Sequence, residues 1–378
     1  MRAAQGLNVA DVIVVGAGPA GSQTARRLAE GGADVLLLDV ARFPREKPCG
    51  GVLGERAVEM AGPQVADLAE AVGQGSEVYY DGRLMGSNRL RAYFFRRTTL
   101  DAHLVGQAVE AGAVLREGVR VTGVEVSPEG AFVRSPGGPF SAQIVVGADG
   151  TNSVVGRSVG LSPLRGDSRY AALRAIVPVT PDEAEALGVA NPTRQAVHFF
   201  SDLFGFAWVA PNRGAVNVGL GASVDKAAGL RERFARFVDG LGLKAAAARG
   251  AQIPYMPLPR VSALRVILTG DAGGFVDPWS GAGIEEGLAA SEEAATVCLE
   301  ALDEGNFSAA SLARFDARCA LQLRRLRGRG QWVKFADRFT RPGVRFPYWV
   351  ERILREAAGL DTSFIARHRG LSAGFPAP

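Results

Sequence analysis

The feature that most constrains the fold of this 378-residue chain is a glycine-rich turn near its start, set between a strand and a helix. The apolar run 11–16 (DVIVVG) predicts a buried strand, and residues 19–30 have helical periodicity up to two glycines. A second buried strand, 34–39 (DVLLLD), follows. Strand, helix and strand form a βαβ unit with parallel strands, which predicts an α/β fold.

The turn itself, GAGPAG, matches the GxGxxG pattern of dinucleotide-binding proteins. Its first glycine allows a tight turn, its second lets the backbone approach a pyrophosphate, and its third lets helix and strand pack closely. Free N–H groups at the helix start favour phosphate. The ordered strand, helix and terminal acid disfavour a turn that binds nothing. The predicted cofactor-binding residues here are Gly16, Gly18, Pro19, Ala20, Gly21 and, for a ribose, Asp39.

Two further turns place an aspartate at the end of a predicted parallel strand. The segment 147–150 (GADG) follows strand 144–146, and 270–274 (GDAGG) follows strand 266–269. Ligands bind at the carboxyl edge of open α/β sheets. Asp149 and Asp271 are also good turn formers, but their joint placement favours a ligand site.

Between these turns the pattern changes to that of an antiparallel sheet. Asp81-Gly82 predicts a two-residue hairpin, and a helix is expected at 100–111. Further strands are expected at 119–126, 131–134, 143–147, in a long antiparallel stretch over 170–211, and at 216–222. The chain then returns to parallel-strand character and to a long helix at 283–302. A nucleotide domain interrupted by an inserted sheet is therefore expected.

Five segments together resemble the p-hydroxybenzoate hydroxylase-like flavoprotein superfold and, within it, the geranylgeranyl reductase family of FAD-dependent oxidoreductases. They are GAGPAGS, RFPREKPCGG (42–51), RTTLD (97–101), GADGTNSVVGR (147–157) and GDAGGFVDPWSGAGIEEGL (270–288). The resemblance implies bound FAD, with Arg97 near its phosphate or ribityl chain and Asp271 on the ribitol. It also assigns to FAD the residues Lys47, Pro48, Cys49, Gly50, Asp149, Gly150, Gly270, Gly281, Gly283 and Ile284. From the sequence alone, Arg97 equally fits a solvated charge at a helix start.

The fold class expected from the resemblance is α/β (α+β overall). A discontinuous Rossmann-like FAD-binding domain carries an inserted antiparallel β-sheet substrate domain and is followed by a helical C-terminal region. We predict the FAD-binding domain at 1–75, 97–165 and 262–310, the substrate domain at 76–96 and 166–261, and the helical cap at 311–378.

Three residues are the predicted catalytic group: Cys49, Phe206 and Trp208. By resemblance, the cysteine of KPCGG lies near the flavin, where a thiol can donate a proton, and Lys47 is a cation that could lower its pKa. A small buried hydrophobe fits Cys49 equally well. Phe206 and Trp208 are two apart in a strand and share a face, which lines either a substrate cavity, as the resemblance implies, or a core. The family often has a larger aromatic residue where this chain has Ala210.

The resemblance implies a reductase that saturates C=C bonds of a geranylgeranyl, polyprenyl or similar apolar substrate. Because no second GxGxxG follows a strand, NAD(P)H or another electron donor is expected to bind transiently. Two alternatives stay open: an FAD-dependent aromatic hydroxylase on the same fold, and a flavin-retaining protein that binds a prenyl lipid without turnover. A halogenase is disfavoured because its active-site lysine has no counterpart between Lys47 and Lys226.

The C-terminal region carries the main charge asymmetry. From 314 to 355 there are twelve Lys or Arg residues and three acids, in a chain of net charge +4. With the aromatic residues interspersed from Trp332 to Trp349, this segment predicts either peripheral contact with the inner face of a membrane or a solvated helical cap. No nucleic-acid motif is present. Three cysteines without metal-site spacing, and no signal peptide or long apolar run, favour a cytoplasmic protein without a metal.

Overall fold

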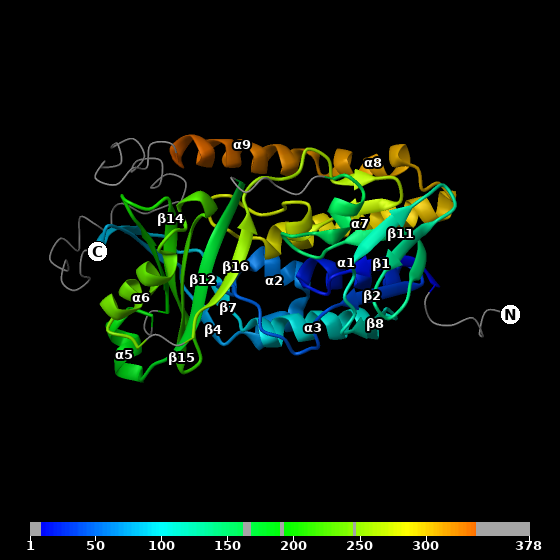
Figure 1. The fold of residues 1–378 in the computed structure, drawn as a ribbon. Coiled ribbons are helices and arrows are strands. Elements are labelled where there is room, and N and C mark those ends of the chain that lie inside the picture. Colours follow the sequence, from blue (N-terminus) through cyan, green and yellow to red (C-terminus); the bar gives the residue numbers. More distant parts are fainter. Residues whose placement is uncertain (1–8, 162–167, 190–192, 245–246, 338–378) are drawn as a thin grey trace. The chain divides into compact units, whose positions relative to one another are not determined.

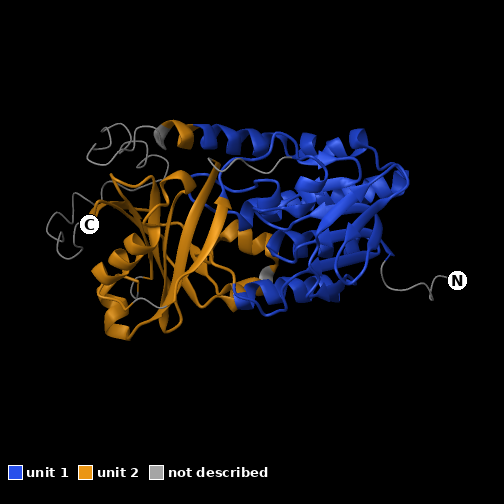
Figure 2. Ribbon diagram, viewed as in Figure 1, with its two compact units in different colours: residues 1–46, 98–165, 254–331 blue, residues 47–97, 166–253, 332–378 orange. Residues whose placement is uncertain are grey.

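The computed structural model describes residues 9–161, 168–189, 193–244 and 247–337 (Figure 1). The chain divides into two compact units, and each of them is assembled from separate stretches of the sequence (Figure 2). The first unit comprises 1–46, 98–165 and 254–331, and the second comprises 47–97, 166–253 and 332–378. Residues 47–75, which we expected in the FAD-binding domain, thus fall in the second unit. Residues 311–331, expected in a separate cap, fall in the first.

The first unit is built on a parallel sheet. Its elements are β1 (Val9–Val15), α1 (Pro19–Glu30), β2 (Val35–Asp39), α3 (Arg97–Glu110), β8 (Val114–Glu117), β9 (Gly123–Val126), β10 (Ala131–Arg134), β11 (Phe140–Gly147), α4 (Val154–Ser158), β17 (Ser262–Ala263), β18 (Val266–Leu268), η4 (Gly270–Ala272), α7 (Ile284–Glu304), α8 (Ala309–Arg318) and α9 (Ala320–Asp337). Strands β18, β11, β1, β2 and β8 are parallel neighbours in that order. The hairpin of β9 and β10 joins β11 in antiparallel fashion. The predicted parallel sheet and fold class are confirmed.

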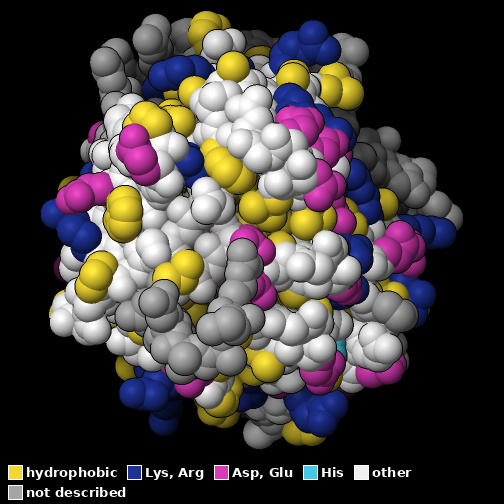
Figure 3. Space-filling view, turned by 90° about the vertical axis from the view of Figure 1, so that its right-hand side faces the viewer, with side chains coloured by type: hydrophobic (Ala, Val, Ile, Leu, Met, Phe, Trp, Pro, Cys, Tyr) yellow, Lys and Arg dark blue, Asp and Glu magenta, His cyan; other side chains and the backbone are white. Residues whose placement is uncertain are grey.

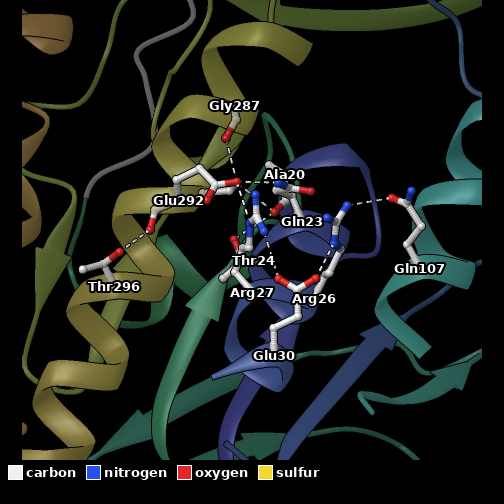
Figure 4. A network of polar contacts seen from close by, with 11 residues as sticks. Ala20, Gln23, Thr24, Arg26, Arg27, Glu30, Gln107, Gly287, Glu292 and Thr296 are labelled. Atoms are coloured by element: carbon white, nitrogen blue, oxygen red, sulfur yellow. Dashed lines mark hydrogen bonds and ion pairs between the residues drawn. The ribbon is translucent and has the colours of Figure 1, made fainter. Parts of the chain in front are cut away.

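Helix α1 lies between α7 and α3 in one layer, and polar contacts hold it from both sides (Figure 4). Arg27 Nε donates to Glu292 Oε1 of α7 at 2.9 Å. Arg26 Nη1 donates to Gln107 Oε1 of α3 at 3.1 Å. Below this layer every residue of β2 (VLLLD) is buried. The helix that carries the glycine turn is therefore fixed on three sides.

The second unit is built on antiparallel strands. Its elements are β3 (Val52–Gly54), α2 (Glu55–Ala61), η1 (Pro63–Leu68), β4 (Ala71–Gly73), β5 (Ser76–Tyr80), β6 (Arg83–Ser87), β7 (Ala92–Phe94), β12 (Arg169–Pro178), α5 (Pro181–Ala186), β13 (Gln195–Phe199), β14 (Gly205–Asn212), β15 (Ala215–Ser223), η3 (Val224–Lys226), α6 (Leu230–Gly240) and β16 (Arg249–Pro254). The large sheet has the order β16-β12-β15-β14-β13-β5-β6, and a small one has the order β3-β7-β4. The hairpin predicted at Asp81-Gly82 joins β5 to β6.

The two faces of the large sheet differ. On one face, Phe234 and Val238 of α6 pack into a core that includes Val218 and Leu220. On the other face a smaller apolar cluster contains Trp208. One face of the sheet therefore packs against α6, and the other face carries the cluster around Trp208.

Three sequence expectations differ from the structure. The strand expected at 119–126 begins only at Gly123. Helix α5 interrupts the long antiparallel stretch, because Thr180 and Glu183 form a capping box with Pro181 at the first helical position. Strand β13 pairs in parallel with β5. In the described ranges, no helix combines the length and the apolar character that a membrane crossing requires.

Candidate active site

The glycine turn is closely packed, as its sequence predicts. A Cβ added to Gly21 would lie 1.8 Å from the carbonyl oxygen of Gly16, so only glycine lets α1 approach the end of β1 this closely. Helix α1 begins at Pro19, its N-cap Gly18 offers no side-chain hydrogen bond, and its first turn contains no acid. The positive end of the helix is thus left to a ligand, and it fits a pyrophosphate.

Asp39 braces this turn. It is 9% exposed, and its Oδ2 accepts a hydrogen bond from Ala17 N at 2.7 Å. Its Oδ1 accepts from Ala41 N, also at 2.7 Å. The carboxylate therefore fixes the backbone that would meet the phosphates, and its predicted hydrogen bond to a ribose stays a prediction.

The second motif lies against the first. Because β1 and β11 are parallel neighbours, their carboxyl ends meet, and Ala148 N donates to Val15 O at 2.8 Å. Asp149 Oδ2 accepts from Val154 N at 2.6 Å and from Val155 N at 3.2 Å, which caps α4. Burial raises the pKa of Asp149 against the hydrogen bonds that lower it. Its Oδ1 is buried and has no hydrogen-bond partner among the described residues, which fits a hydroxyl donor from a cofactor.

The third motif closes the same edge. Gly270 follows β18, the other parallel neighbour of β11, and a Cβ added to it would lie 2.8 Å from Cβ of Ala20. Asp271 Oδ1 lies 3.0 Å from the Cβ position of Gly283, which caps the start of α7. Ser291 Oγ donates to Ala20 O at 2.8 Å and so ties α7 to α1. The three glycine motifs, far apart in sequence, thus meet at one edge of the parallel sheet.

Sequence reasoning missed a cation beside the turn. Arg45 Nη2 would lie 3.6 Å from a Cβ added to Gly18, and Nη1 pairs with Asp101 Oδ2 at 3.1 Å. Asp101 has no exposed surface. Both residues lie in segments that carry the family resemblance, so their opposite charges were the sequence signal that could have predicted this pair. A guanidinium held here adds positive charge next to the predicted phosphate position.

The remaining predicted cofactor residues are divided between the two units. Gly150, Gly281 and Ile284 belong to the first unit, and Gly281 N donates to Asp277 O at 2.9 Å in the loop before α7. The residues of the second unit are Lys47, Pro48, Cys49, Gly50 and Arg97, where Arg97 is the first residue of α3 and the rest of that helix belongs to the first unit. Arg97 is only 3% exposed, so the alternative of a solvated charge is wrong.

In the second unit, Phe206 and Trp208 share a face, as expected, with ring centroids 5.9 Å apart. Trp208 is buried in a cluster with Phe94 and Ala210. It lies opposite Gly219 of β15, where an added Cβ would be 1.9 Å from the indole ring. Gly219 therefore makes room for the tryptophan. Whether this face meets a substrate stays a prediction.

Cys49 lies on the same side as Trp208, and an asparagine that sequence reasoning missed joins them. A Cβ added to Gly50 would lie 3.6 Å from Trp208 Nε1. Asn217 Nδ2 donates to Cys49 O and to Gly50 O, both at 2.9 Å. Its Oδ1 accepts from Trp208 Nε1 at 3.2 Å. The one sequence signal was a polar residue inside the otherwise apolar strand AVNVGLGA.

Several arginines in the described part of the basic C-terminal segment pair with groups of the first unit. Arg325 Nη2 donates to Glu286 Oε2 of α7 at 2.7 Å, Arg327 Nη2 donates to Leu258 O at 2.8 Å, and Arg329 pairs with Asp277. Arg318 pairs with Glu300. Figure 3 likewise shows acidic and basic side chains intermixed on the face that it draws. The residues Arg338, Phe339, Arg341, Arg345, Phe346, Tyr348 and Trp349 lie outside the described residues.

Comparison with known proteins agrees with this geometry. A model of the FAD binding domain family matches residues 9–214. Digeranylgeranylglycerophospholipid reductase 2 of Methanopyrus kandleri is 32% identical over 82% of this chain and 81% of its own length. Menaquinone reductase of Mycolicibacterium smegmatis is 30% identical over 74% of each chain. The crystal structure of a geranylgeranyl bacteriochlorophyll reductase-like protein from Thermoplasma acidophilum has the same fold, with a TM-score of 0.77, 22% identity and coverage of 96% and 99% of the two chains.

The parallel sheet with its three converging turns and the matching family model define an FAD-dependent oxidoreductase. The chain belongs to the geranylgeranyl reductase family of these flavoproteins.

Proposed function

We propose that this protein saturates C=C bonds in the prenyl chain of a lipid. The similar proteins are named for digeranylgeranylglycerophospholipid and for menaquinone. These lipids have unrelated head groups but both carry a chain of isoprene units. The prenyl chain is therefore the substrate feature that the comparison supports.

The observation that carries the proposal is the apolar face around Trp208 with the Cys49 segment against it. Phe206 and Trp208 would bind the prenyl chain and exclude water from it. Cys49 is partly exposed, so its thiol would give a proton to one alkene carbon and regain one from solvent. Reduced FAD, when bound, would supply the hydride for the other carbon. The alkene is thus reduced by one hydride and one proton.

The first unit would hold the cofactor. The start of α1 and Arg45 would bind its pyrophosphate, and Asp149 Oδ1 and Asp271 would accept hydrogen bonds from its hydroxyls. NAD(P)H or another electron donor would bind transiently and reduce the FAD.

The test is an anaerobic half-reaction. The FAD-loaded protein is reduced without oxygen and mixed with either a geranylgeranyl glycerophospholipid or menaquinone. Flavin reoxidation and the mass of the prenyl chain are followed together. A gain of two hydrogens per double bond supports the proposal. Reoxidation only after oxygen is admitted, with oxygen added to an aromatic ring, would point to a hydroxylase. A lipid that binds but never reoxidises the flavin would point to a binding protein.

We further propose a cytoplasmic protein that contacts an anionic membrane through its segment from residue 338 onward. The arginines of α9 that bind carboxylates and carbonyls of the first unit are not free for lipid head groups. The segment from residue 338 onward carries Arg338, Arg341 and Arg345, with several aromatic residues between them. Sedimentation with anionic vesicles should be lost when the chain ends at residue 337, and zwitterionic vesicles are the control. Equal sedimentation of both chain lengths would contradict this proposal.

A further inference from the structure

Three consecutive carbonyl groups of the cysteine segment are held by hydrogen bonds within the second unit. Asn217 Nδ2 binds the first two, Cys49 O and Gly50 O. Phe95 N donates to the third, Gly51 O, at 2.8 Å. Gly51 N in turn points at Cys49 Sγ, 3.4 Å away. The peptide that carries the thiol therefore has its direction set by one side chain and one backbone group.

The chemistry of the amide fixes its orientation. Its NH₂ group has two donors, which face two carbonyl acceptors, and its oxygen faces the indole N–H. A flipped amide would point donors at a donor and its acceptor at two acceptors. Asn217 has no exposed surface, so water does not replace a lost partner. An aspartate has no donor for these carbonyls, and a leucine has neither donor nor acceptor.

The asparagine also sits on a rigid support. Strand β15 pairs with β14 on one side and with β12 on the other, and at Asn217 the partners are Ala210 and Ile176. Side chains on a central strand hold their neighbours better than those on a loop. The segment from Arg42 to Gly51, in contrast, contains neither helix nor strand in the structure.

We propose that Asn217 is the positioning residue of this site: it fixes the Cys49–Gly50 peptide against Trp208 and thereby sets where the thiol lies. Trp208 is thus coupled to the cysteine through one amide, so the residue that would bind the prenyl chain and the residue that would protonate it keep a constant spacing. The catalytic meaning of this spacing rests on the proposed function, whereas the fixing of the peptide does not.

The test is the alkylation rate of Cys49 by iodoacetamide in the FAD-loaded protein. Cys298 and Cys319 are buried, and burial raises the pKa of each thiol to about 12, so Cys49 is the thiol that reacts. Cys49→Ser identifies its signal. Asn217→Leu should speed alkylation about tenfold or more, the population change expected when two hydrogen bonds are lost. Trp208→Phe, which keeps the amide bonds to the carbonyls, should have a smaller effect in the same direction.

Asn212 offers a matched control. It is a buried asparagine of the neighbouring strand β14, and its Nδ2 donates to Glu70 at 2.7 Å. Asn212→Leu also removes a buried amide, but it should leave the alkylation rate within about twofold of wild type. If Asn217→Leu does not fold, Asn217→Ser takes its place. A wild-type rate in whichever of these variants folds overturns the proposal.

Turnover gives a second readout, which depends on the proposed function. If lipid is reduced, Asn217→Leu should lower kcat with little change in KM, and combining it with Cys49→Ser should cost no more than Cys49→Ser alone. Additive losses would contradict a role through the cysteine. If no lipid is reduced, the proposed function fails, but the alkylation result for Asn217 stands.

Discussion

The two units place functional groups by different means. In the first unit, parallel strands end at one edge, and glycine turns bring backbone groups together there. In the second unit, antiparallel strands put side chains from different strands on one face, where Asn217 links the Trp208 indole to the backbone of Cys49 and Gly50. Sites made of backbone depend on local glycine patterns, whereas sites made of side chains depend on strand register. The units should therefore differ in which substitutions damage them.

The largest effect is expected in the glycine turn. In Gly21→Ala the new Cβ would meet a backbone oxygen at 1.8 Å, so α1 must move away from β1. We expect a loss of about 4 kcal/mol or more in the free energy of unfolding, measured with urea. Gly18→Ala is the matched control, because its Cβ would meet only the flexible end of Arg45 at 3.6 Å. That variant should keep its stability without FAD but bind FAD at least about tenfold more weakly, if the second glycine admits the pyrophosphate. Equal stability of the two variants would contradict this account.

The corresponding position in the second unit is Gly219. A Cβ there would lie 1.9 Å from a side chain, the Trp208 indole, which can yield more than a backbone oxygen. Gly219→Ala should therefore cost about 3 kcal/mol, the upper part of the range for overpacking. Gly221→Ala, two residues along the same strand, meets Ala172 Cβ at an ordinary 3.6 Å and should cost less than about 1 kcal/mol. Thermal unfolding of both variants measures the difference, and similar midpoints would show that the indole moves aside freely.

This contrast explains what the sequence could predict. The GxGxxG turn, its helix and both neighbouring strands are local patterns, and the structure has them at nearly the expected residues. The hairpin at Asp81-Gly82 is local as well. The hydrogen bond between Asn217 and Cys49 joins residues 168 apart, and the parallel pairing of β13 with β5 also joins segments that are remote in sequence. Neither follows from periodicity, because periodicity gives the face of a residue but not its cross-strand neighbour.

A pH effect on stability is expected on the helix-covered face of the second unit. His198 is 3% exposed, stacks on Tyr79 at 4.7 Å and meets Phe237 edge-on, while Glu77 binds the Tyr79 hydroxyl. Burial lowers the pKa of His198 to about 4. Between pH 6.5 and 4 the unfolded chain therefore takes up a proton that the folded chain does not, and the free energy of unfolding falls as the pH falls. At pH 5 the loss in the free energy of unfolding from His198 is about 2 kcal/mol.

The measurement compares urea unfolding of wild type and His198→Phe at pH 7 and pH 5. The phenylalanine keeps the stacking but does not titrate. The stability of wild type relative to the variant should therefore drop by about 2 kcal/mol on acidification. A constant difference between the two proteins would show that His198 takes up its proton as readily in the folded sheet as in the unfolded chain.

The smallest effect concerns the contact of α9 with the first unit. Glu286 is buried at the start of α7, and its carboxylate accepts from Gln322 Nε2 at 2.6 Å and pairs with Arg325. Glu286→Gln should lower the free energy of unfolding by about 1 kcal/mol, because a neutral amide is a weaker acceptor than the carboxylate for the hydrogen bonds from Arg325 and Gln322. The exposed pair of Glu300 and Arg318 is the control, and Glu300→Gln should cost less than about 0.5 kcal/mol. Added salt should remove the second loss but not the first. Equal, salt-sensitive losses would mean that the α9 arginines are held no more firmly than surface charges. Those arginines could then also bind lipid head groups.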